Sequence, residues 1–416
     1  MNAAQIKSYL AKIPLPCDLA QLPETAYLVG GSVRDALLGR YKTPIDLDFV
    51  LPQGAIATAR KIANLYGAGF VVLDQEREIA RVVFDQGTLD LARQEGASLD
   101  DDLNRRDFTI NSLAYNIRQQ KLVDSLGGFE DLQQGVLRMV SPQNLEDDPL
   151  RLLRAYRQAA QLNFEIETDT RSAICDRTSL LKTVAGERVQ AELNYILAAP
   201  QGSKWLTAAI KDGLFRFWLS YAGQVDRDQL SAIVRGVEYC RDIGFAQSEL
   251  PLMANLATLV TPELTIAEAE LKQLKYARAI IKAVTKTVKL LPTLQQMTGY
   301  MSLREQYHWF LEVKDIFPIL IARAIATGVA SEIIQPLIER YLDPADLVAH
   351  PQSLVTGNDL INRLNLPPSP LIGKLLTEIQ IAQIENKIST PQQAIDFAHS
   401  MLPSSSQQHS SMSNEQ

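Results

Sequence analysis

The fold is decided by two neighbouring stretches, Tyr27-Leu-Val-Gly-Gly-Ser-Val-Arg-Asp35 and Thr43-Pro-Ile-Asp-Leu-Asp-Phe49. A strand that enters Gly30-Gly31 lets backbone N–H groups approach a ligand that a Cβ atom would hold off. If the chain then turns into a helix, those N–H groups favour an anion such as a triphosphate, and Arg34 adds a guanidinium contact. The first stretch therefore predicts a phosphate-binding turn at Gly30, Gly31 and Arg34.

The second stretch predicts a strand with two carboxylates on one face. Asp46 and Asp48 alternate with Ile45, Leu47 and Phe49, so on a strand both carboxylates point the same way. Two carboxylates that close repel unless a hard cation neutralises them, and Mg²⁺ is the expected ion. An isolated Asp-x-Asp is more often the wet face of an amphipathic strand, but the preceding glycine turn favours a metal site.

A third carboxylate is expected because two-metal phosphoryl chemistry usually uses one. The runs 79–84 and 89–92 flank the turn Asp85-Gln86-Gly87 and predict a hairpin. Asp90 lies in the second run and is the candidate. A solvent-facing strand residue is the alternative interpretation.

Two further clusters follow along the chain. Arg105, Arg106, Asp107 and Asn111 fall within one short element and could contact phosphate and ribose, although such a charge run is often only a solvated helix start.

In the second cluster, Asp148-Pro149 predicts a helix start, with Arg151 and Arg154 near Asp148. A carboxylate beside a guanidinium can pair with a base edge as another nucleotide would, so side chains could serve as the template. The alternative is a capping residue with a weak surface ion pair.

Composition limits the remaining function classes. The 416 residues exceed one usual core, and 46% apolar with 21% charged residues is typical of a folded protein. The three cysteines are scattered and fit neither a disulfide framework nor a zinc site. We expect a cytoplasmic location and no membrane segment, because no long apolar run or secretory signal occurs. The net charge of −7 requires any nucleic acid to be bound by local basic stripes.

One such stripe is predicted on a single helix over 271–291. Its cations recur at helical spacing and would follow an RNA backbone. They are Lys275, Arg278, Lys282, Lys286 and Lys289. A helix with an ordinary basic surface is the alternative.

These motifs together resemble a known family. The segments Gly-Gly-x-Val-Arg-Asp, Asp-x-Asp, Arg-Arg-Asp-Phe-Thr-Ile-Asn, Asp-Pro-Leu-Arg-x-Leu-Arg-Ala and Glu187-Arg-Val-Gln-Ala-Glu-Leu193 occur here in one order. That order is similar to the class II bacterial CCA-adding enzyme and poly(A) polymerase family of the polymerase-β-like nucleotidyltransferases. The resemblance is dense over about residues 25–200.

The resemblance implies an α+β fold, in which a mixed-sheet nucleotidyltransferase head precedes an all-α neck, body and tail. We expect the head at 1–140, the neck at 141–200, the body at 201–345, the tail at 346–402 and a disordered terminus at 403–416. Body and tail would bind tRNA.

The resemblance also implies roles for single residues. Asp46 and Asp48 would hold Mg²⁺, Arg106 and Asp107 would contact phosphate and sugar, and Glu187 and Arg188 would buttress the neck helix. Base selection would fall to a further set that consists of Asp148, Arg151 and Arg154, with Arg157 nearby.

The implied reaction is template-independent addition of CC, or CCA, to tRNA 3′ ends from CTP, and from ATP for the adenosine, with two Mg²⁺ ions. The short connection between Arg93 and Asp102 is similar to members that add only the two cytidines and leave adenosine to a separate A-adding enzyme. A poly(A) polymerase and a catalytically silent RNA-binding protein are the alternatives.

Overall fold

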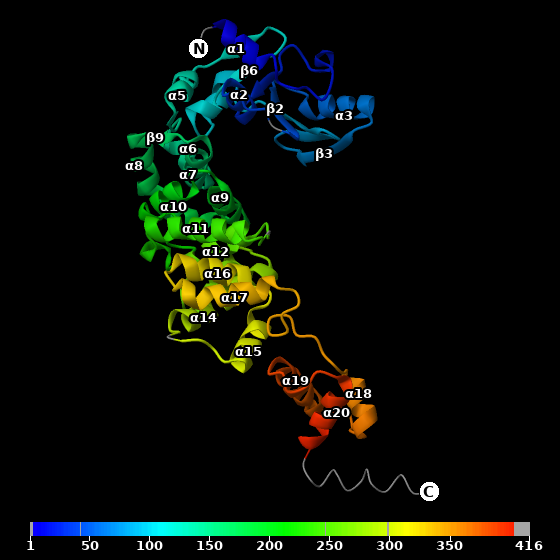
Figure 1. The fold of residues 1–416 in the computed structure, drawn as a ribbon. Helices are drawn as coiled ribbons and strands as arrows, with labels where there is room; N and C mark the ends of the chain where they lie inside the picture. The colour runs from blue at the N-terminus through cyan, green and yellow to red at the C-terminus, as the bar shows by residue number, and fades with distance from the viewer. Residues whose placement is uncertain (1–2, 42, 246, 298, 403–416) are drawn as a thin grey trace. The chain divides into compact units, whose positions relative to one another are not determined.

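The structure is a computed structural model that describes residues 3–402 except 42, 246 and 298. The chain forms two compact units, Met1–Arg227 with Glu270–Tyr276, and Asp228–Ala269 with Ala277–Gln416. Every strand of the described residues belongs to the first unit, which Figure 1 colours from blue to green. Within the described residues, no helix is both long and apolar enough to span a bilayer. The α+β fold class is thus confirmed.

The core of the first unit is a seven-stranded mixed sheet in the order β3-β4-β5-β2-β1-β6-β7. Within this sheet only β2 and β5 pair in parallel, and all other neighbours are antiparallel. The strands are β1 Tyr27–Val29, β2 Ile45–Leu51, β3 Gly69–Asp74, β4 Ile79–Phe84, β5 Gly87–Arg93, β6 Ala114–Asn116 and β7 Lys121–Val123. A separate two-stranded sheet pairs β8 Val136–Leu137 with β9 Glu165–Ile166.

The sheet has one covered and one open face around β3, β4 and β5. Helix α3 (Ala55–Tyr66) packs on these strands, and it closes one face over Ala80, Val82, Leu89 and Leu91, all fully buried. Since side chains alternate along a strand, the carboxylates of β2 and β5 lie on the opposite face. The predicted hairpin of β4 and β5 is confirmed, with Phe84 opposite Gly87.

Helices surround and follow this sheet in the first unit, where α7 packs against α9 and α10. Besides α3 they are α1 Ala3–Leu10, α2 Gly31–Leu37, α4 Leu99–Asn104, α5 Gly128–Gln134, α6 Pro142–Asp147, α7 Leu150–Leu162, α8 Thr168–Arg177, α9 Gly186–Ala198 and α10 Gly202–Lys211. The helix expected from Asp148-Pro149 begins at Leu150, one residue later than predicted, because Pro149 and not Asp148 is its N-cap; Asp148, with an extended backbone, is the C-cap of α6.

The prediction of one helix over 271–291 is wrong. Helix α13 (Leu264–Gln273) ends and α14 (Arg278–Gln295) begins after a break. Lys275 takes a left-handed φ of 62°. The N–H groups of Tyr276 and Lys275 donate to the carbonyls of Leu271 and Lys272, which is the Schellman pattern that ends a helix. Lys275 therefore does not lie on the helix that carries the other predicted cations.

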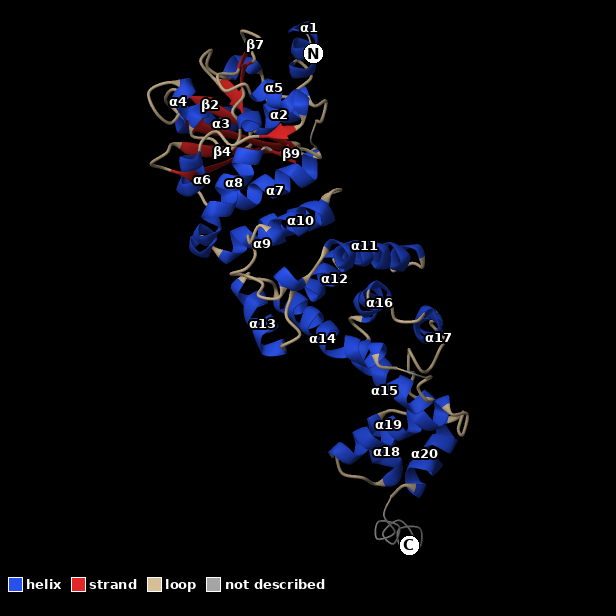
Figure 2. Cartoon of the chain, turned by 90° about the vertical axis from the view of Figure 1, so that its left-hand side faces the viewer, coloured by secondary structure: helices blue, strands red, loops and turns tan. Residues whose placement is uncertain are grey.

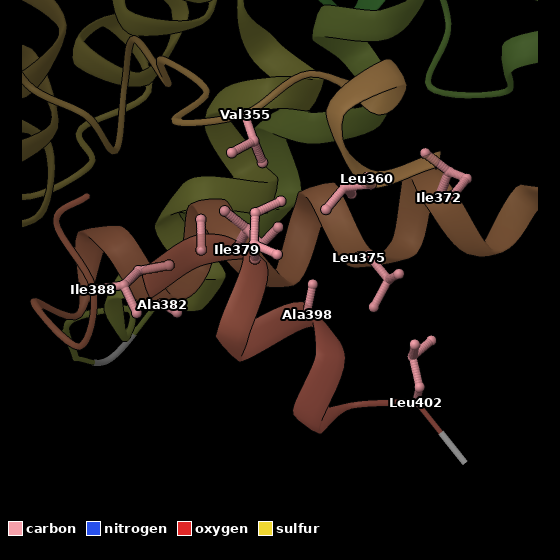
Figure 3. Packing of buried hydrophobic residues seen from close by; sticks show 11 residues of the cluster. Val355, Leu360, Ile372, Leu375, Ile379, Ala382, Ile388, Ala398 and Leu402 are labelled. Atoms are coloured by element: carbon pink, nitrogen blue, oxygen red, sulfur yellow. The ribbon is translucent and has the colours of Figure 1, made fainter. Parts of the chain in front are cut away.

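The second unit is helical throughout its described elements. Its helices are α11 Arg227–Asp242, α12 Leu250–Leu259, α14, α15 Leu303–Val313, α16 Phe317–Ala326, α17 Ser331–Leu342, α18 Gly357–Leu364, α19 Pro370–Ile384 and α20 Pro391–Ser400. The last three pack around buried aliphatic side chains that include Leu360, Leu375, Ile379 and Ala398 (Figure 3). The division into head, neck, body and tail stays a prediction, and the segment 403–416 lies outside the described residues.

Candidate active site

The glycine turn joins β1 to α2 beside an arginine. Gly30 has a φ of +73°, and a Cβ atom built on it would lie 3.1 Å from Nη1 of Arg106. A side chain there would therefore meet both backbone strain and a guanidinium. Ser32, in the first turn of α2, donates from Oγ to the carbonyl of Asp46 at 2.9 Å. This hydrogen bond ties the glycine turn to the strand with the two aspartates.

Asp46 and Asp48 lie on the open face of β2, as their spacing predicts. The parallel register places Thr88 of β5 beside Asp46, and Asp90 beside Asp48. Thr88 donates from Oγ1 to Oδ1 of Asp46 at 2.8 Å. Desolvation by surrounding protein, then the charges of Asp46 and Asp90, raise the pKa of Asp48 to about 6, although the residue keeps contact with solvent. This crowding of negative charge is what a bound cation would relieve.

Asp90, the candidate third carboxylate, is held by an arginine. Arg81 on β4 donates from Nε and Nη2 to the two carboxylate oxygens of Asp90, at 2.7 and 2.8 Å. Among the described residues no group of three or more His, Cys, Asp or Glu side chains is placed to hold a metal ion. Asp90 lies beside Asp48 in the strand register, and both of its carboxylate oxygens accept hydrogen bonds from Arg81.

The predicted nucleotide-binding residues line one recess of about 420 Å³. The lining consists of Gly30, Gly31, Arg34, Asp48, Arg106, Asp107, Asn111, Asp148, Arg151, Arg154, Arg157 and Gln158. Four parts of the chain contribute: the glycine turn with the start of α2, strand β2 through Asp48, the segment after α4, and helix α7 with Asp148 just before it. The lining brings arginines and carboxylates to one place, which suits a ligand with phosphates at one end and a polar ring at the other.

A hydrogen-bond network fixes the wall between these elements. Asn111 accepts from Nη1 of Arg34 at 2.6 Å and donates to Asp107 Oδ1 at 2.8 Å and to Gln158 Oε1 at 2.9 Å. Arg154 of α7 donates from Nε to the other oxygen of Asp107 at 2.9 Å. Burial alone would raise the pKa of Asp107, but Arg154 and Asn111 outweigh it and hold that pKa below its ordinary value. Asp107 is therefore an ionised anchor for Arg154.

Two side chains of α9 support helix α7. Arg188 forms an ion pair with Asp148 at 3.1 Å, as the resemblance implied for this residue. Glu187 is exposed in the first turn of α9, and the second support is instead Glu192, whose Oε2 lies 2.8 Å from Nε of Arg157. Burial raises the pKa of Glu192 and lowers the pKa of Arg157.

The remaining cations of the predicted basic stripe lie on α14 in the second unit. Arg278, Lys282, Lys286 and Lys289 follow one another at spacings of three or four residues and therefore share one side of the helix. Lys289 forms an ion pair with Glu312 at 3.1 Å. Lys282 and Lys286 form no ion pair with an acidic side chain of the described residues.

Two side chains of the site were missed from the sequence, and both had a usable signal. Arg81 lies opposite Asp90, and the two-residue turn of the hairpin already fixes that pairing. Gln158 follows Arg154 by four residues on the predicted helix, which places it on the same face. It also accepts from Arg34 at 3.1 Å.

Three family models match the chain. Residues 26–138 match the poly A polymerase head domain, and residues 163–222 match a probable RNA and SrmB-binding site of polymerase A. Residues 246–398 match a putative tRNA nucleotidyltransferase domain 2. The first match contains the glycine turn and the aspartates.

Two curated relatives are similar over nearly the whole chain. A CC-adding tRNA nucleotidyltransferase of Synechocystis sp. is 48% identical over 95% of this chain and 98% of that protein. A CC-adding tRNA nucleotidyltransferase of Geobacter sulfurreducens is 33% identical over 92% and 94%. A solved structure, the Thermotoga maritima CCA-adding enzyme complexed with tRNA, has the same fold, with a TM-score of 0.73 at 21% identity over 96% and 98% of the two chains.

Proposed function

This chain belongs to the tRNA nucleotidyltransferase family, and from that premise we propose that it transfers cytidylate from CTP to the 3′ end of tRNA, twice, without a nucleic-acid template. The observation that carries the proposal is the recess in which the glycine turn, Asp48 and the arginines of α7 meet. In this recess the glycine turn offers a site for phosphates, Asp48 a site for a cation, and the arginines of α7 a site for the edge of a base, and the three sites adjoin one another. The proposed location is the cytoplasm.

Asp46 and Asp48 fit a pair of Mg²⁺ ions by the chemistry of their donors. Both are carboxylates on one strand face, and desolvation followed by the charge of Asp46 raises the pKa of Asp48. When bound, the two ions would neutralise the triphosphate and make the tRNA 3′-hydroxyl a better nucleophile. Asp90, tied to Arg81, is proposed to contribute charge beside Asp48 and not a ligand.

Arg106 is the proposed phosphate contact within the recess. Its Nη2 donates to Asp102 at 2.9 Å, and its Nη1 lies against the glycine turn. Its buried Nε has no hydrogen-bond partner among the described residues. A buried donor without a partner costs free energy that a bound anion would recover. The triphosphate is therefore proposed to lie between Arg106 and Gly30-Gly31.

Helix α7 is proposed to select the base. Asp148 can accept from the amino group of cytosine, while Arg151 and Arg154 can donate to the ring acceptors beside it. Asp107 and Arg188 hold two of these side chains in place, so the template is pre-organised and costs little ordering entropy when CTP binds.

The connection between β5 and α4 supports addition of cytidine alone. It spans only 94–98 and is held by hydrogen bonds from its backbone N–H groups. Gln94 donates to the carbonyl of Leu51 at 2.8 Å, Glu95 to Asp102 at 3.0 Å and Ala97 to Asp101 at 2.9 Å. So short and fixed a segment leaves little room to rearrange the site for a second base. We therefore propose that a separate A-adding enzyme completes the end.

The product on defined tRNA tests this function. Transcripts that end before CC, after one C and after CC would each be incubated with labelled CTP or ATP and Mg²⁺. We expect two, one and no cytidines, and no adenosine on any transcript. A long ladder from ATP would instead show a poly(A) polymerase. Retention of tRNA with no incorporation would show a silent RNA-binding protein.

A further inference from the structure

Two rows of side chains cross the open face of the sheet from the aspartates to its edge. The strand registers align Asp48 with Asp90, Asp90 with Arg81, and Arg81 with Val71. They likewise align Asp46, Thr88, Val83 and Gly69 in a second row. Cross-strand partners point to the same face. The first row is therefore polar from β2 to β4 and ends in Val71 on β3, whereas the second is polar on β2 and β5 and ends in Val83 and Gly69.

The outer part of these rows carries the exposed side chains of Val71 and Val83, and we define the apolar strip as these two residues with Leu73, which follows Val71 by two residues on β3 at a register shift of the β3–β4 pair. The exposed fractions of Val71, Leu73 and Val83 are 48%, 50% and 42%. The other face of the same strands is covered by α3, and Ala80 and Val82 there are fully buried. Gly69 keeps the strip open, since a Cβ atom on it would lie 3.2 Å from Cβ of Val83. Exposed apolar side chains gathered in one place mark binding surfaces more often than scattered ones do.

The strip lies at a definite reach from the aspartates. Neighbouring strands are about 4.8 Å apart, so Val83 lies roughly 10 Å from Asp46, and Val71 roughly 14 Å from Asp48. That reach corresponds to a short single-stranded extension of an RNA whose end lies at Asp46 and Asp48. Arg81 lies between the aspartates and the strip. Its Nε and Nη2 donate hydrogen bonds to Asp90, and its Nη1 has no hydrogen-bond acceptor among the described residues.

We propose that the apolar strip and Arg81 form the surface on which the last unpaired nucleotides of the tRNA acceptor lie while the terminal hydroxyl is extended. Apolar side chains suit base and ribose faces without regard to sequence, and the guanidinium suits a phosphate between them. The inference rests on the proposed function, because the chain end must reach the aspartates. A second protein chain pairing along the edge strand β3 is the competing occupant, and the experiment separates the two.

The test compares binding of two tRNAs by the full-length protein. One transcript ends before the CC and keeps its unpaired 3′ nucleotide, and the other is trimmed to a blunt acceptor stem. The variant combines Val71→Thr with Val83→Thr, because threonine keeps the β-branched shape and the strand propensity. Leu65→Gln is the matched control, since Leu65 is 59% exposed on α3, which covers the other face.

We expect the wild type and L65Q to prefer the transcript with the unpaired end, and the double variant to lose about fivefold of that preference through weaker apolar contact. Affinity for the blunt transcript should stay unchanged. An undiminished preference in the double variant would overturn the inference. So would a difference in oligomeric state between the double variant and the wild type in sedimentation, because it would assign the strip to a protein partner. Absence of cytidine incorporation by the wild type would instead defeat the proposed function.

Discussion

Asp48 is the residue in which the demands of folding and of catalysis conflict. Desolvation, Asp46 and Asp90 all favour its protonated form, and Arg106 and Arg81 only partly oppose them. A raised carboxyl pKa means that the metal-free fold is more stable when Asp48 is protonated. This contribution is present at low pH and is lost as the pH rises through about 6. Such a cost is typical of sites built to hold a ligand.

The first prediction concerns this cost. Asp48→Asn removes the ionised carboxylate, so in EDTA at pH 7.5 the variant should unfold at a higher temperature than the wild type. The difference in unfolding temperature should shrink as the pH falls below about 6, because the protonated wild-type carboxyl is then uncharged, like the asparagine. Thermal unfolding across this pH range measures it. Asp85→Asn, in the exposed β4–β5 turn, should leave the unfolding temperature unchanged. Equal unfolding temperatures for D48N and wild type at pH 7.5 would contradict the account.

Much of the residue-level site followed from sequence, because its motifs pair charged side chains with glycine or with strand alternation. The ion-pair partner of each charged side chain could not be predicted from the sequence. The resemblance named Arg188 as a support but not its ion pair with Asp148, forty residues earlier, and Glu192 supports α7 where Glu187 was expected. Such pairs depend on how two helices pack, and spacing within either helix does not determine that.

At the scale of elements, the strands and helices that were predicted have strong local signals, and those that were missed do not. Strand β2 and the β4–β5 hairpin alternate clearly, whereas β6 and β8 have only three and two residues. The break between α13 and α14 could not be foreseen, because lysine seldom takes the left-handed conformation that Lys275 adopts. Apolar periodicity simply continued across it.

The second prediction concerns packing between elements of the first unit. Gly186 begins α9, and a Cβ atom built on it would lie 2.0 Å from the carbonyl oxygen of Gln273 at the end of α13. Gly186→Ala should therefore force the two backbones apart and lower the free energy of unfolding by about 1–3 kcal/mol. Urea denaturation measures the change.

Gly223→Ala is the control for this substitution, because nothing lies within 4 Å of a Cβ atom built there. The control should unfold at the same urea concentration as the wild type, or slightly higher. If G186A were as stable as G223A, the close approach of α9 to the end of α13 would be refuted.

At the scale of the whole molecule, a protein with a net charge of −7 must attract a polyanion through local features. The first unit concentrates arginines in the recess, and α14 carries Arg278, Lys282 and Lys286 on one side of a helix in the other unit. Because each unit offers its own cationic surface, we expect RNA binding to depend on both.

The third prediction tests the α14 surface. Replacing Lys282 and Lys286 by glutamine should weaken tRNA binding and reduce the slope of log affinity against log salt by about 2, roughly one for each lost phosphate contact. Fluorescence anisotropy at several salt concentrations provides the slope. Lys61→Gln, on the exposed side of α3, should leave the slope unchanged. An unchanged slope in the double variant would mean that α14 has an ordinary basic surface.

The central claim is that Asp46 and Asp48 perform the transfer, with Asp48 lining the recess that binds nucleotide. Its most direct test is a single-turnover measurement of labelled cytidylate transfer to pre-bound tRNA lacking CC, with Asp46→Asn or Asp48→Asn compared with the wild type. The account predicts that each variant binds this tRNA as tightly as the wild type and transfers cytidylate at least about a thousandfold more slowly. Transfer at the wild-type rate in either variant would contradict it.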